Sequence, residues 1–252
     1  MRLLIGDTGL VGKNLLKQKS FDFTYNSSNI KNLEVYARHG DELYLSCLPA
    51  AKWMVNQNLK QDILNIQNII GQVRKLSYSK IVLISTIDVY NDSPQGVDED
   101  YPPNIAKLSY GANRYLFELM VKEMLRYDVL QIFRLPALYG PYLKKNVVYD
   151  LLNKNNPDQI NANSAYQWYN LNDLSHHIDI CTRRHPGEAV FNLFPEPVET
   201  QEITNLFPDV TPEHRPRMEY NYKTKFTRTG YLYDKETSLS SLKNFINEAS
   251  CK

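Results

Sequence analysis

The sequence has no long hydrophobic run and no excess of charge of one sign. No stretch approaches the roughly 20 consecutive apolar residues that a membrane-spanning helix needs, and 29 Lys and Arg are balanced by 28 Asp and Glu. A surface without a strong field of one sign offers little attraction to nucleic acid or to an anionic membrane, so we expect neither partner. The N-terminal stretch MRLLIGDTGLVG becomes glycine-rich too early for a secretory signal, which indicates a cytoplasmic protein.

Cysteine is also scarce, and histidine is not arranged for metal binding. The three cysteines, Cys47, Cys181 and Cys251, are far apart and outside any C-x-x-C pattern, so neither a disulfide framework nor a zinc site is indicated. We expect reduced, mostly structural thiols. The adjacent His176 and His177 would project about 100° apart on a helix and so would not ligate one metal together. The sequence therefore predicts no metal site.

Short β-rich runs alternate with helical stretches through the first half of the 252-residue chain. The expected strands span 2–5, 21–25, 42–47, 80–85 and 129–134, and the expected helices start at 11 and run through 62–76 and 109–126. Such alternation predicts a Rossmann-type, doubly wound α/β fold with a mainly parallel sheet that is covered on both faces.

The regular alternation weakens after Tyr139, where polar, Asn-rich segments such as NKNNPDQINANS appear and a strand-like piece, AVFNLF, returns. We therefore expect residues 1–140 to form a dinucleotide-binding core and residues 141–252 to form a small, interleaved C-terminal substrate-binding lobe of the same domain. The stretch 90–108 contains three prolines and a glycine, which predicts a loop. Loops at strand ends are where doubly wound folds bind ligands.

Three glycines follow the first expected strand. Gly6, Gly9 and Gly12 form G-x-x-G-x-x-G between the strand RLLI and the next expected helix. Glycines in this position let the backbone turn tightly and approach a pyrophosphate, whose charge is stabilised at the helix N-terminus. A turn without a ligand is the alternative, but the position of the motif favours a dinucleotide. The residues predicted to bind the cofactor in this turn are Gly6, Thr8, Gly9, Leu10, Val11 and Gly12.

The end of the second expected strand bears on which dinucleotide binds. An acidic residue there would hydrogen-bond the ribose 2′-hydroxyl of NAD and repel a 2′-phosphate, whereas this stretch reads TYNSSN. Asn26, Ser27 and Ser28 offer neutral donors suited to a phosphate, although no arginine accompanies them. We therefore predict NADP(H) in preference to NAD(H), with NAD(H) still allowed. The alternative is that these are turn residues only.

A second group of polar residues is expected at the same edge of the sheet as the glycine turn. The apolar strand KIVLIST ends in Ser85 and Thr86, whose hydroxyls would emerge at its carboxyl end. Tyr110 and Arg114 stand four residues apart and would share one face of the helix that starts near residue 109. A reacting carbonyl could therefore meet a hydroxyl from the strand and a phenol from the helix.

These motifs resemble those of a known family. GDTGLVG, ISTIDVY, YGANR and FRLPALYGP are similar to the motifs of the extended short-chain dehydrogenase/reductases, in particular the NAD(P)-dependent epimerases and dehydratases that modify nucleotide sugars. The resemblance runs from Met1 to about Leu193 and includes QWYNLNDL and AVFNLFPEPV. It implies that Thr86 hydrogen-bonds the substrate oxygen and that Tyr110 is the general acid/base. The remaining residues that we predict beside the cofactor are Leu48, Pro49, Ser85, Tyr110, Arg114 and Pro136.

Arg114 departs from the pattern of that family, which usually has lysine at this position. In the family the lysine holds the nicotinamide ribose and lowers the pKa of the phenol from about 10. Arginine keeps the charge and the donors but does not release a proton in a protein. We therefore expect electrostatic activation of Tyr110 to survive and any proton relay through residue 114 to fail. The alternative is a solvent-exposed Arg114 in a non-catalytic, dinucleotide-binding regulatory protein.

The residues after Thr86 bear on the reaction. In the family's 4,6-dehydratases the next two residues are acidic, whereas this sequence has Ile87 and Asp88. Ile87 cannot transfer a proton, so dehydration is disfavoured. Asp88 is either a base that contacts the substrate or an acceptor of backbone hydrogen bonds in a turn. We therefore predict hydride transfer alone, in a reductase or an epimerase that acts on a keto-sugar nucleotide or a related carbohydrate.

The loop after Tyr139 lines the substrate site in the proteins that this sequence resembles. Here Lys144 and Lys145 could meet a diphosphate and Asn146 a sugar hydroxyl, although adjacent loop lysines are often simply solvated. Trp168 could stack on a base or a sugar, although aromatics are 12% of the chain and mostly serve packing. The predicted substrate-binding residues are Asp88, Tyr139, Lys144, Lys145, Asn146 and Trp168. Family members often form homodimers, so the resemblance allows a second copy as a partner beside the small-molecule substrate.

Overall fold

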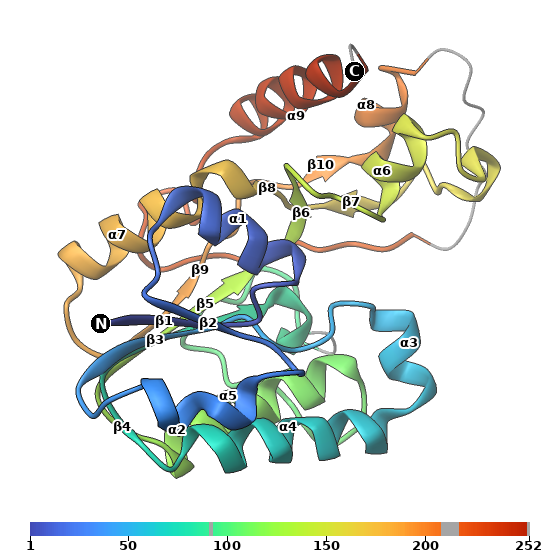
Figure 1. Ribbon diagram of the computed structural model, residues 1–252. Coiled ribbons are helices and arrows are strands. Elements are labelled where there is room, and N and C mark those ends of the chain that lie inside the picture. The colour runs from blue at the N-terminus through green and yellow to red at the C-terminus, as the bar shows by residue number, and fades with distance from the viewer. Residues whose placement is uncertain (91–92, 208–216, 251–252) are drawn as a thin grey trace. The chain divides into compact units, whose positions relative to one another are not determined.

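The computed structural model describes residues 1–90, 93–207 and 217–250 (Figure 1). The chain divides into two compact units. The first unit comprises Met1–Ser93, Tyr101–Arg134 and Asp173–Phe191, and the second comprises Pro94–Asp100, Leu135–Asn172 and Asn192–Lys252. Each unit is therefore assembled from segments that are far apart in the sequence.

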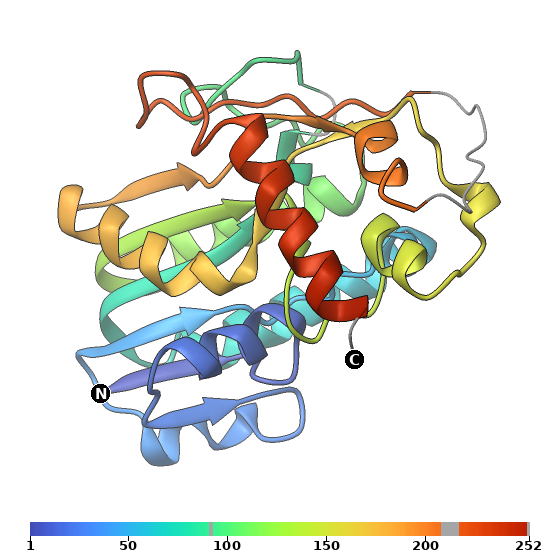
Figure 2. The same cartoon turned by 90° about the horizontal axis from the view of Figure 1, so that it is seen from above.

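A six-stranded sheet forms the centre of the first unit. Figure 2 shows its strands from blue at one edge to orange at the other, in the order β2 (Phe23–Tyr25), β1 (Arg2–Ile5), β3 (Asp41–Leu45), β4 (Ser77–Thr86), β5 (Arg126–Leu135) and β9 (Ala189–Asn192). β1 pairs in parallel with both β2 and β3, and β3 pairs in parallel with β4. The predicted α/β fold is confirmed. The progress of the chain across the sheet reverses between β1 and β3, which is the switch point where doubly wound sheets bind ligands.

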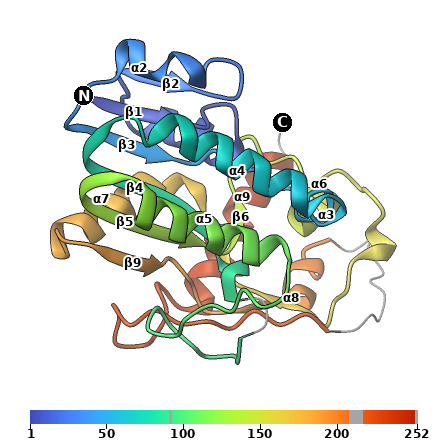
Figure 3. The ribbon, with the colours of Figure 1, turned by 90° about the horizontal axis from the view of Figure 1, so that it is seen from below.

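Helices cover both faces of this sheet (Figure 1 and Figure 3). On one face lie α1 (Leu10–Gln18) and α7 (Leu174–Arg184), and on the other lie α2 (Leu33–Tyr36), α4 (Leu59–Val73) and α5 (Tyr110–Met124). The central strands are buried on both faces, which explains why they read as continuous apolar runs and not as alternating ones. The core of this unit includes Leu3, Ile5, Leu43, Leu45, Ile66, Ile70, Val73, Ile81, Leu83 and Val121.

A short helix that the sequence analysis did not expect, α3 (Lys52–Gln57), precedes α4. The two helices are separated at Asn58, whose φ of −146° and ψ of 65° are not helical. The Asn58 side chain accepts a hydrogen bond from the backbone N–H of Gln61 at 3.2 Å. Because such a cap satisfies a donor that a new helix N-terminus leaves open, it stabilises the break between α3 and α4.

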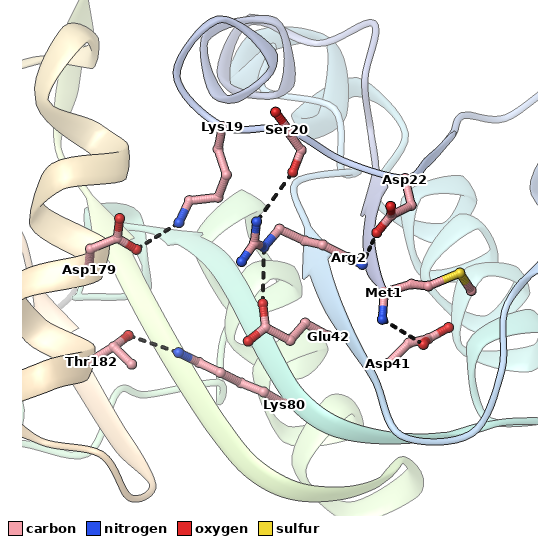
Figure 4. A network of polar contacts seen from close by, with 10 residues as sticks. All are labelled: Met1, Arg2, Lys19, Ser20, Asp22, Asp41, Glu42, Lys80, Asp179 and Thr182. Carbon is pink, nitrogen blue, oxygen red and sulfur yellow. Dashed lines mark hydrogen bonds and ion pairs between the residues drawn. The ribbon is translucent and has the colours of Figure 1, made fainter.

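A polar network ties α1 and α7 to the amino-terminal half of the sheet (Figure 4). Its contacts are Arg2–Glu42 at 3.0 Å, Lys19–Asp179 at 2.7 Å, Lys80–Thr182 at 2.8 Å, and the N-terminal amine with Asp41 at 3.1 Å. These side chains come from three strands and from the residues at the end of α1 and within α7. Three ion pairs and one hydrogen bond therefore lie at the end of the sheet opposite to the glycine turn.

The second unit contains two small sheets. β6 (Ala137–Tyr139) pairs in parallel with β8 (Trp168–Asn170), and β10 (Val198–Glu199) pairs antiparallel with β7 (Ala165–Tyr166). Its helices include α6 (Val147–Leu152), α8 (Thr200–Thr204) and α9 (Lys235–Ser250). Tyr139, Trp168, Val198, Leu242 and Ile246 are among the residues of its core.

Glu99 attaches the segment Pro94–Asp100 to the rest of the second unit. Its carboxylate accepts hydrogen bonds from the backbone N–H groups of Asn192 and Lys225 and from the hydroxyl of Thr224, at 2.7 to 2.8 Å. Three donors around one mostly buried carboxylate stabilise its charge. Part of the stretch predicted as a loop, 90–108, is thus held in place by side-chain hydrogen bonds.

Cys47 and Cys181 occur as thiols and not in a disulfide. Burial raises the pKa of the Cys47 thiol to about 12, so at neutral pH it stays protonated and unreactive. Cys251 lies outside the described residues. Within the described ranges, no helix is both long and apolar enough to cross a bilayer.

Candidate functional site

Packing explains two of the three glycines in the turn between β1 and α1. Gly6 has a φ of +105°, and a Cβ there would lie 2.3 Å from the carbonyl oxygen of Ser46, just after β3. A Cβ on Gly12 would lie 2.0 Å from the carbonyl oxygen of Gly6. The Gly6 N–H donates to the carbonyl oxygen of Tyr25 at 2.7 Å, so the turn is attached to the ends of both neighbouring strands. The fold itself requires these two glycines.

Gly9 differs, because its neighbours leave room for a side chain. It is the N-cap of α1, and a Cβ there would come no closer than 3.4 Å to the carbonyl oxygen of Gly6. α1, which is described in full, has no side-chain cap at Gly9 and no acidic residue in its first turn. Its first N–H groups therefore form a positive site that a phosphate can approach closely. With Thr8 exposed and Leu10 and Val11 half-buried beside it, the turn fits the pyrophosphate of a dinucleotide.

The residues after β2 contact the glycine turn, and they meet a carboxylate there that the sequence analysis did not assign. The Asn26 amide donates to a carboxylate oxygen of Asp7 at 3.1 Å. The Ser28 hydroxyl and N–H both donate to the Asn26 side-chain oxygen, at 2.6 and 2.9 Å. Two of the three neutral residues expected to meet a phosphate are therefore engaged with protein groups, and the third, Ser27, is exposed.

Thr86 and Asp88 lie where β4 passes into the short helix η2 (Ile87–Tyr90). The Thr86 hydroxyl accepts a hydrogen bond from the Asp88 N–H at 3.2 Å and lies 3.4 Å from an Asp88 carboxylate oxygen. Because a contact of 3.4 Å is weak, the Thr86 hydroxyl can instead donate its hydrogen bond to a substrate oxygen. The other Asp88 carboxylate oxygen pairs with the Lys52 ammonium of α3 at 2.6 Å.

Tyr110 is positioned by the N-terminus of α5. Ser109 caps the helix by accepting a hydrogen bond at 3.1 Å from the backbone N–H three residues on. The Tyr110 N–H donates to the side chain of Asn56 at 3.0 Å. Gly111 permits the close approach of η2, because a Cβ there would lie 1.9 Å from the Asp88 carbonyl oxygen. The stretch SYG thus supplies a helix cap, the phenol and the small residue that brings α5 against η2.

α3 connects the two elements that carry Thr86 and Tyr110. Lys52 and Asn56 stand four residues apart and share a face of the helix. Lys52 reaches Asp88 of η2, and Asn56 reaches the first N–H of α5. One short helix therefore holds the threonine and the tyrosine in a fixed relation.

Arg114 is buried and paired. It is 5% exposed and donates to both carboxylate oxygens of Asp62, which is 4% exposed, at 2.8 and 3.1 Å. It also donates to the Pro49 carbonyl oxygen at 2.8 Å, and its guanidinium carbon lies 4.4 Å from the centre of the Tyr110 ring. The alternative of a solvent-exposed helix arginine is therefore wrong.

Burial raises the pKa of the Tyr110 hydroxyl above its ordinary value. The nearby Arg114 charge lowers this pKa, whereas Asp88 and Asp62 raise it. We expected the arginine to bring the pKa of the phenol down, and its own contribution has that direction, but burial and the two carboxylates outweigh it. The neutral phenol is favoured, and at neutral pH it is better suited to donate a proton than to accept one.

Ser85 is held by a buried ion pair. Its hydroxyl donates to a Glu118 carboxylate oxygen at 2.5 Å. Glu118 accepts two hydrogen bonds from Arg134 of β5, at 3.0 and 2.6 Å, and Arg134 donates to the Tyr90 hydroxyl at 2.5 Å. Since the one proton of the Ser85 hydroxyl is engaged, this residue can meet a cofactor only as an acceptor.

Three further residues predicted beside the cofactor differ in their surroundings. Leu48 packs against the core of the first unit. The carbonyl oxygen of the exposed Pro49 accepts a hydrogen bond from Arg114. Pro136 is buried in the second unit, between β5 and β6. Their contact with a cofactor stays a prediction.

Two aromatics predicted to bind the substrate lie in the core of the second unit. Tyr139 is fully buried and packs on Phe245, with 5.6 Å between ring centres, and Trp168 is 1% exposed. A side chain buried to this degree has no surface to offer to a ligand. Both residues serve packing, which corrects the prediction that they contact the substrate.

The predicted loop residues of the second unit fall into two groups. Lys144 and Lys145 are exposed and accessible to an anion. Asn146 caps α6, because its side chain accepts a hydrogen bond from the Tyr149 N–H at 3.1 Å and donates to the Leu138 carbonyl oxygen at 2.7 Å. Its φ of 142° is rare for a residue with a side chain, and the two hydrogen bonds hold it there. Contact of Asn146 with a sugar hydroxyl stays a prediction.

The second unit also contains a cavity of about 350 Å³ with many polar side chains around it. Its lining includes Asp150, Asn155, Asn161, Ser164 and Tyr166, and none of the residues predicted to bind the substrate. Amides, a hydroxyl and one aromatic ring are groups that can hydrogen-bond a sugar or a base.

Several polar residues of the site were missed in the sequence. Asp62 is in phase with the buried isoleucines and valine of α4, so an acid on an apolar helix face was an available signal. Glu118 follows Arg114 by one helical turn and was a similar signal. Lys52 and Asn56 carried no such signal, because α3 is too short to show a periodicity. In the ranges that the structure describes, no group of three or more His, Cys, Asp or Glu could hold a metal.

No family model and no curated protein sequence matches the chain. Solved structures match its fold along almost its whole length. TunA, an NAD-dependent NDP-hexosamine 5,6-dehydratase, has a TM-score of 0.76 at 12% identity, over 100% of this chain and 98% of TunA. The dTDP-4-dehydrorhamnose reductase of Bacillus anthracis, in complex with NADP, has a TM-score of 0.73 at 18% identity, over 98% of both chains. The UDP-glucose 4-epimerase of Thermotoga maritima, with UDP-glucose, has a TM-score of 0.72 at 14% identity, over 98% of both chains.

The chain has the fold of these enzymes. They are extended short-chain dehydrogenase/reductases, so the fold that the motifs led us to expect is confirmed. At identities of 12% to 18% the likeness establishes the fold and leaves the chemistry to be argued from the residues of this chain.

Proposed function

We propose that the protein is a nicotinamide-dinucleotide-dependent enzyme that modifies a keto-sugar nucleotide or a related carbohydrate by hydride transfer. One observation carries the proposal: the open Gly9 turn, Thr86 and Tyr110 belong to one unit and lie at the carboxyl ends of its strands or on a helix held there. The solved structures of similar fold include a reductase in complex with NADP and an epimerase with UDP-glucose, which supports the same class of activity.

The residues of the first unit have separate tasks in this proposal. The Gly9 turn and the N-terminus of α1 would bind the pyrophosphate. The bound nicotinamide would supply or accept the hydride. Thr86 would hold the substrate oxygen by a hydrogen bond, and Tyr110 would give a proton to that oxygen or take one from it.

The surroundings of Tyr110 support reduction more strongly than epimerisation. Burial raises the pKa of its hydroxyl, so the phenol is protonated at neutral pH and can donate to an oxygen that becomes negative as a carbonyl is reduced. Oxidation of a sugar hydroxyl, the first half of an epimerisation of this kind, would need the phenolate. Ile87 is buried and carries no proton to transfer, so dehydration is not part of the proposal.

Consumption of NADH or NADPH with a panel of 4-keto-6-deoxy nucleotide sugars tests the proposal. Tyr110→Phe keeps the ring beside Arg114 and removes the hydroxyl, so we expect dinucleotide binding to persist and kcat/KM to fall by about 10²- to 10⁴-fold. Tyr127→Phe is a matched control, since Tyr127 lies at the start of β5 and its hydroxyl donates to the Lys122 carbonyl of α5. Unchanged turnover in Tyr110→Phe would show that Tyr110 is not the general acid/base. Failure of both dinucleotides to bind would contradict the proposal of a dinucleotide-dependent enzyme.

A non-catalytic, dinucleotide-binding regulatory protein is the second candidate, and the pairing of Arg114 with Asp62 favours it. A guanidinium held by a carboxylate has fewer donors left for a ribose than the usual lysine. Tight dinucleotide binding without turnover, in the unmodified protein and in Arg114→Lys, is the result expected of this candidate. A dinucleotide that stays bound through purification would instead indicate an epimerase that retains its cofactor.

A further inference from the structure

Asp7 places a carboxylate where dinucleotide-binding folds distinguish NAD from NADP. We propose that Asp7 makes the site selective for NAD(H) and against NADP(H), a role that rests on the dinucleotide binding proposed above. In such folds an acidic residue about 20 residues after the first glycine, at the end of the second strand, accepts a hydrogen bond from the ribose 2′-hydroxyl. In this chain that position is Asn26, 20 residues after Gly6, and the carboxylate comes from the glycine turn.

Backbone contacts bring the glycine turn to the end of β2. The N–H groups of Gly6 and Asp7 lie 2.7 and 3.5 Å from the carbonyl oxygen of Tyr25, the last residue of β2. The Asp7 side chain then meets the next residue, Asn26, whose amide nitrogen donates to it at 3.1 Å. Both the backbone and the side chain of Asp7 are thus positioned at the end of β2.

Ser28 and Asn29 fix the orientation of Asn26. The Asn26 side-chain oxygen accepts two hydrogen bonds from Ser28, at 2.6 and 2.9 Å, so its amide nitrogen faces Asp7. The Asn26 N–H donates to the Asn29 side chain at 2.7 Å. The Asn26 and Ser28 donors that the stretch TYNSSN offered to a 2′-phosphate are therefore used within the loop and the glycine turn, Ser27 is exposed, and Asp7 presents an acceptor. A ribose 2′-hydroxyl can donate to that acceptor, whereas an ionised phosphate cannot.

Charge acts in the same direction. A 2′-phosphate carries more than one negative charge at neutral pH, and a carboxylate at contact distance repels it. The basic residue nearest to Asn26 in the sequence, Lys31, is exposed on the short helix η1 (Ile30–Asn32), where water screens its charge. The preference for NADP(H) that the sequence alone led us to expect is therefore reversed in this proposal.

Equilibrium titration with NADH and NADPH, followed by fluorescence, tests the inference without a substrate. We expect the unmodified protein to bind NADPH roughly tenfold more weakly than NADH, or weaker still. Asp7→Asn removes the charge and keeps the size of the side chain, so NADPH binding should tighten and the ratio should approach one. Asp22→Asn removes the same charge just before β2, where Asp22 accepts a hydrogen bond from the Arg2 N–H at 2.7 Å, and should leave the ratio unchanged.

Two outcomes overturn the inference alone. The first is NADPH binding as tight as NADH binding, or tighter, in the unmodified protein, which would leave the proposed function standing. The second is an NADH preference that persists in Asp7→Asn, because another group would then make the selection; Asp7→Ser replaces this variant if it fails to fold. Failure of both dinucleotides to bind overturns the proposed function and the inference with it.

Discussion

Arg114 and Asp62 form a bidentate ion pair inside the first unit, with nitrogen-to-oxygen distances of 2.8 and 3.1 Å. The Asn113 amide donates to the same Asp62 carboxylate at 2.8 Å, which completes its hydrogen bonds. Arg114 is therefore fixed in place, and its charge is largely compensated. Its guanidinium carbon lies 4.4 Å from the centre of the Tyr110 ring and lowers the pKa of that hydroxyl, but burial raises this pKa more strongly.

Asp62→Asn is expected to lower the pKa of Tyr110, because Asp62 is one of the two carboxylates that raise it. In the oxidative direction the phenolate accepts a proton, so kcat/KM rises as the pH rises through this pKa. The rising part of the pH profile should therefore move to lower pH in the variant. Glu34→Gln removes a surface charge that pairs with Lys75 at 3.3 Å and should not move the profile. A profile that stays in place in Asp62→Asn would show that Asp62 does not raise the pKa of the titrating group.

Arg114→Leu should destabilise the protein by about 3–5 kcal/mol, because it leaves the buried Asp62 carboxylate without its cation. Urea unfolding measures the loss. The double variant Arg114→Leu and Asp62→Leu removes both charges, so its loss should be smaller than that of the single variant. Lys75→Ala, which breaks an exposed pair with Glu34, should cost about 1 kcal/mol or less. A double variant less stable than the single one would argue that the pair itself stabilises the fold.

Gly9→Ala and Gly12→Ala should separate binding from folding. A Cβ on Gly12 would overlap the Gly6 carbonyl oxygen at 2.0 Å, so Gly12→Ala should prevent folding or lower the unfolding temperature severely. Gly9→Ala meets no such overlap and should cost only about 1 kcal/mol as a poorer N-cap. Dinucleotide binding should nevertheless weaken in Gly9→Ala, because the methyl group would occupy the space proposed for the pyrophosphate. Full binding by a folded Gly9→Ala protein would place the dinucleotide elsewhere.

The parts of the fold that could be predicted are those that depend on local patterns of consecutive residues. β1 and β4 are apolar runs because they are buried on both faces, and a run of that kind is visible without the structure. The G-x-x-G-x-x-G turn is equally local, since Gly6 and Gly12 pack against each other within one strand-turn-helix unit. Thr86 and Tyr110 could be placed at the sheet edge because each lies at the end or start of a recognisable element.

The polar environment of those residues could not be predicted, because it is made by tertiary contacts. Asp62 meets Arg114 across 52 residues, and Lys52 meets Asp88 across 36. No local pattern states which acid will meet which base. The burial of Trp168 could not be predicted either, because in the sequence an aromatic residue is equally consistent with a ligand-binding position and with a core position. The net direction of the Tyr110 pKa depends on such contacts: Arg114 lowers this pKa, as the sequence led us to expect, whereas burial and the two carboxylates raise it.

Trp168 and the exposed loop lysines offer a contrast between packing and binding. Trp168→Ala should destabilise the protein by about 3–5 kcal/mol, as expected for a large side chain lost from a core. Lys144→Ala and Lys145→Ala lie at exposed positions and should leave the unfolding transition unchanged. If the lysines contact a diphosphate, the double lysine variant should raise KM for the sugar nucleotide while kcat stays the same. An unchanged KM would show that Lys144 and Lys145 are solvated and do not contact the diphosphate.

Lys52→Met tests whether the ammonium beside Asp88 serves the reaction. Asp88 lies 3.4 Å from the Thr86 hydroxyl, and Lys52 neutralises it at 2.6 Å. Without the ammonium, the Asp88 charge would oppose the negative charge that grows on a carbonyl oxygen bound at Thr86, so kcat should fall by about 10- to 100-fold. Asp88→Asn in the same chain removes the uncompensated charge and should restore part of the rate, whereas Lys60→Met, at an exposed position of α4, should change nothing. Rates measured with saturating dinucleotide decide the matter: if Lys52→Met matches the unmodified protein, the pair only holds α3 against η2.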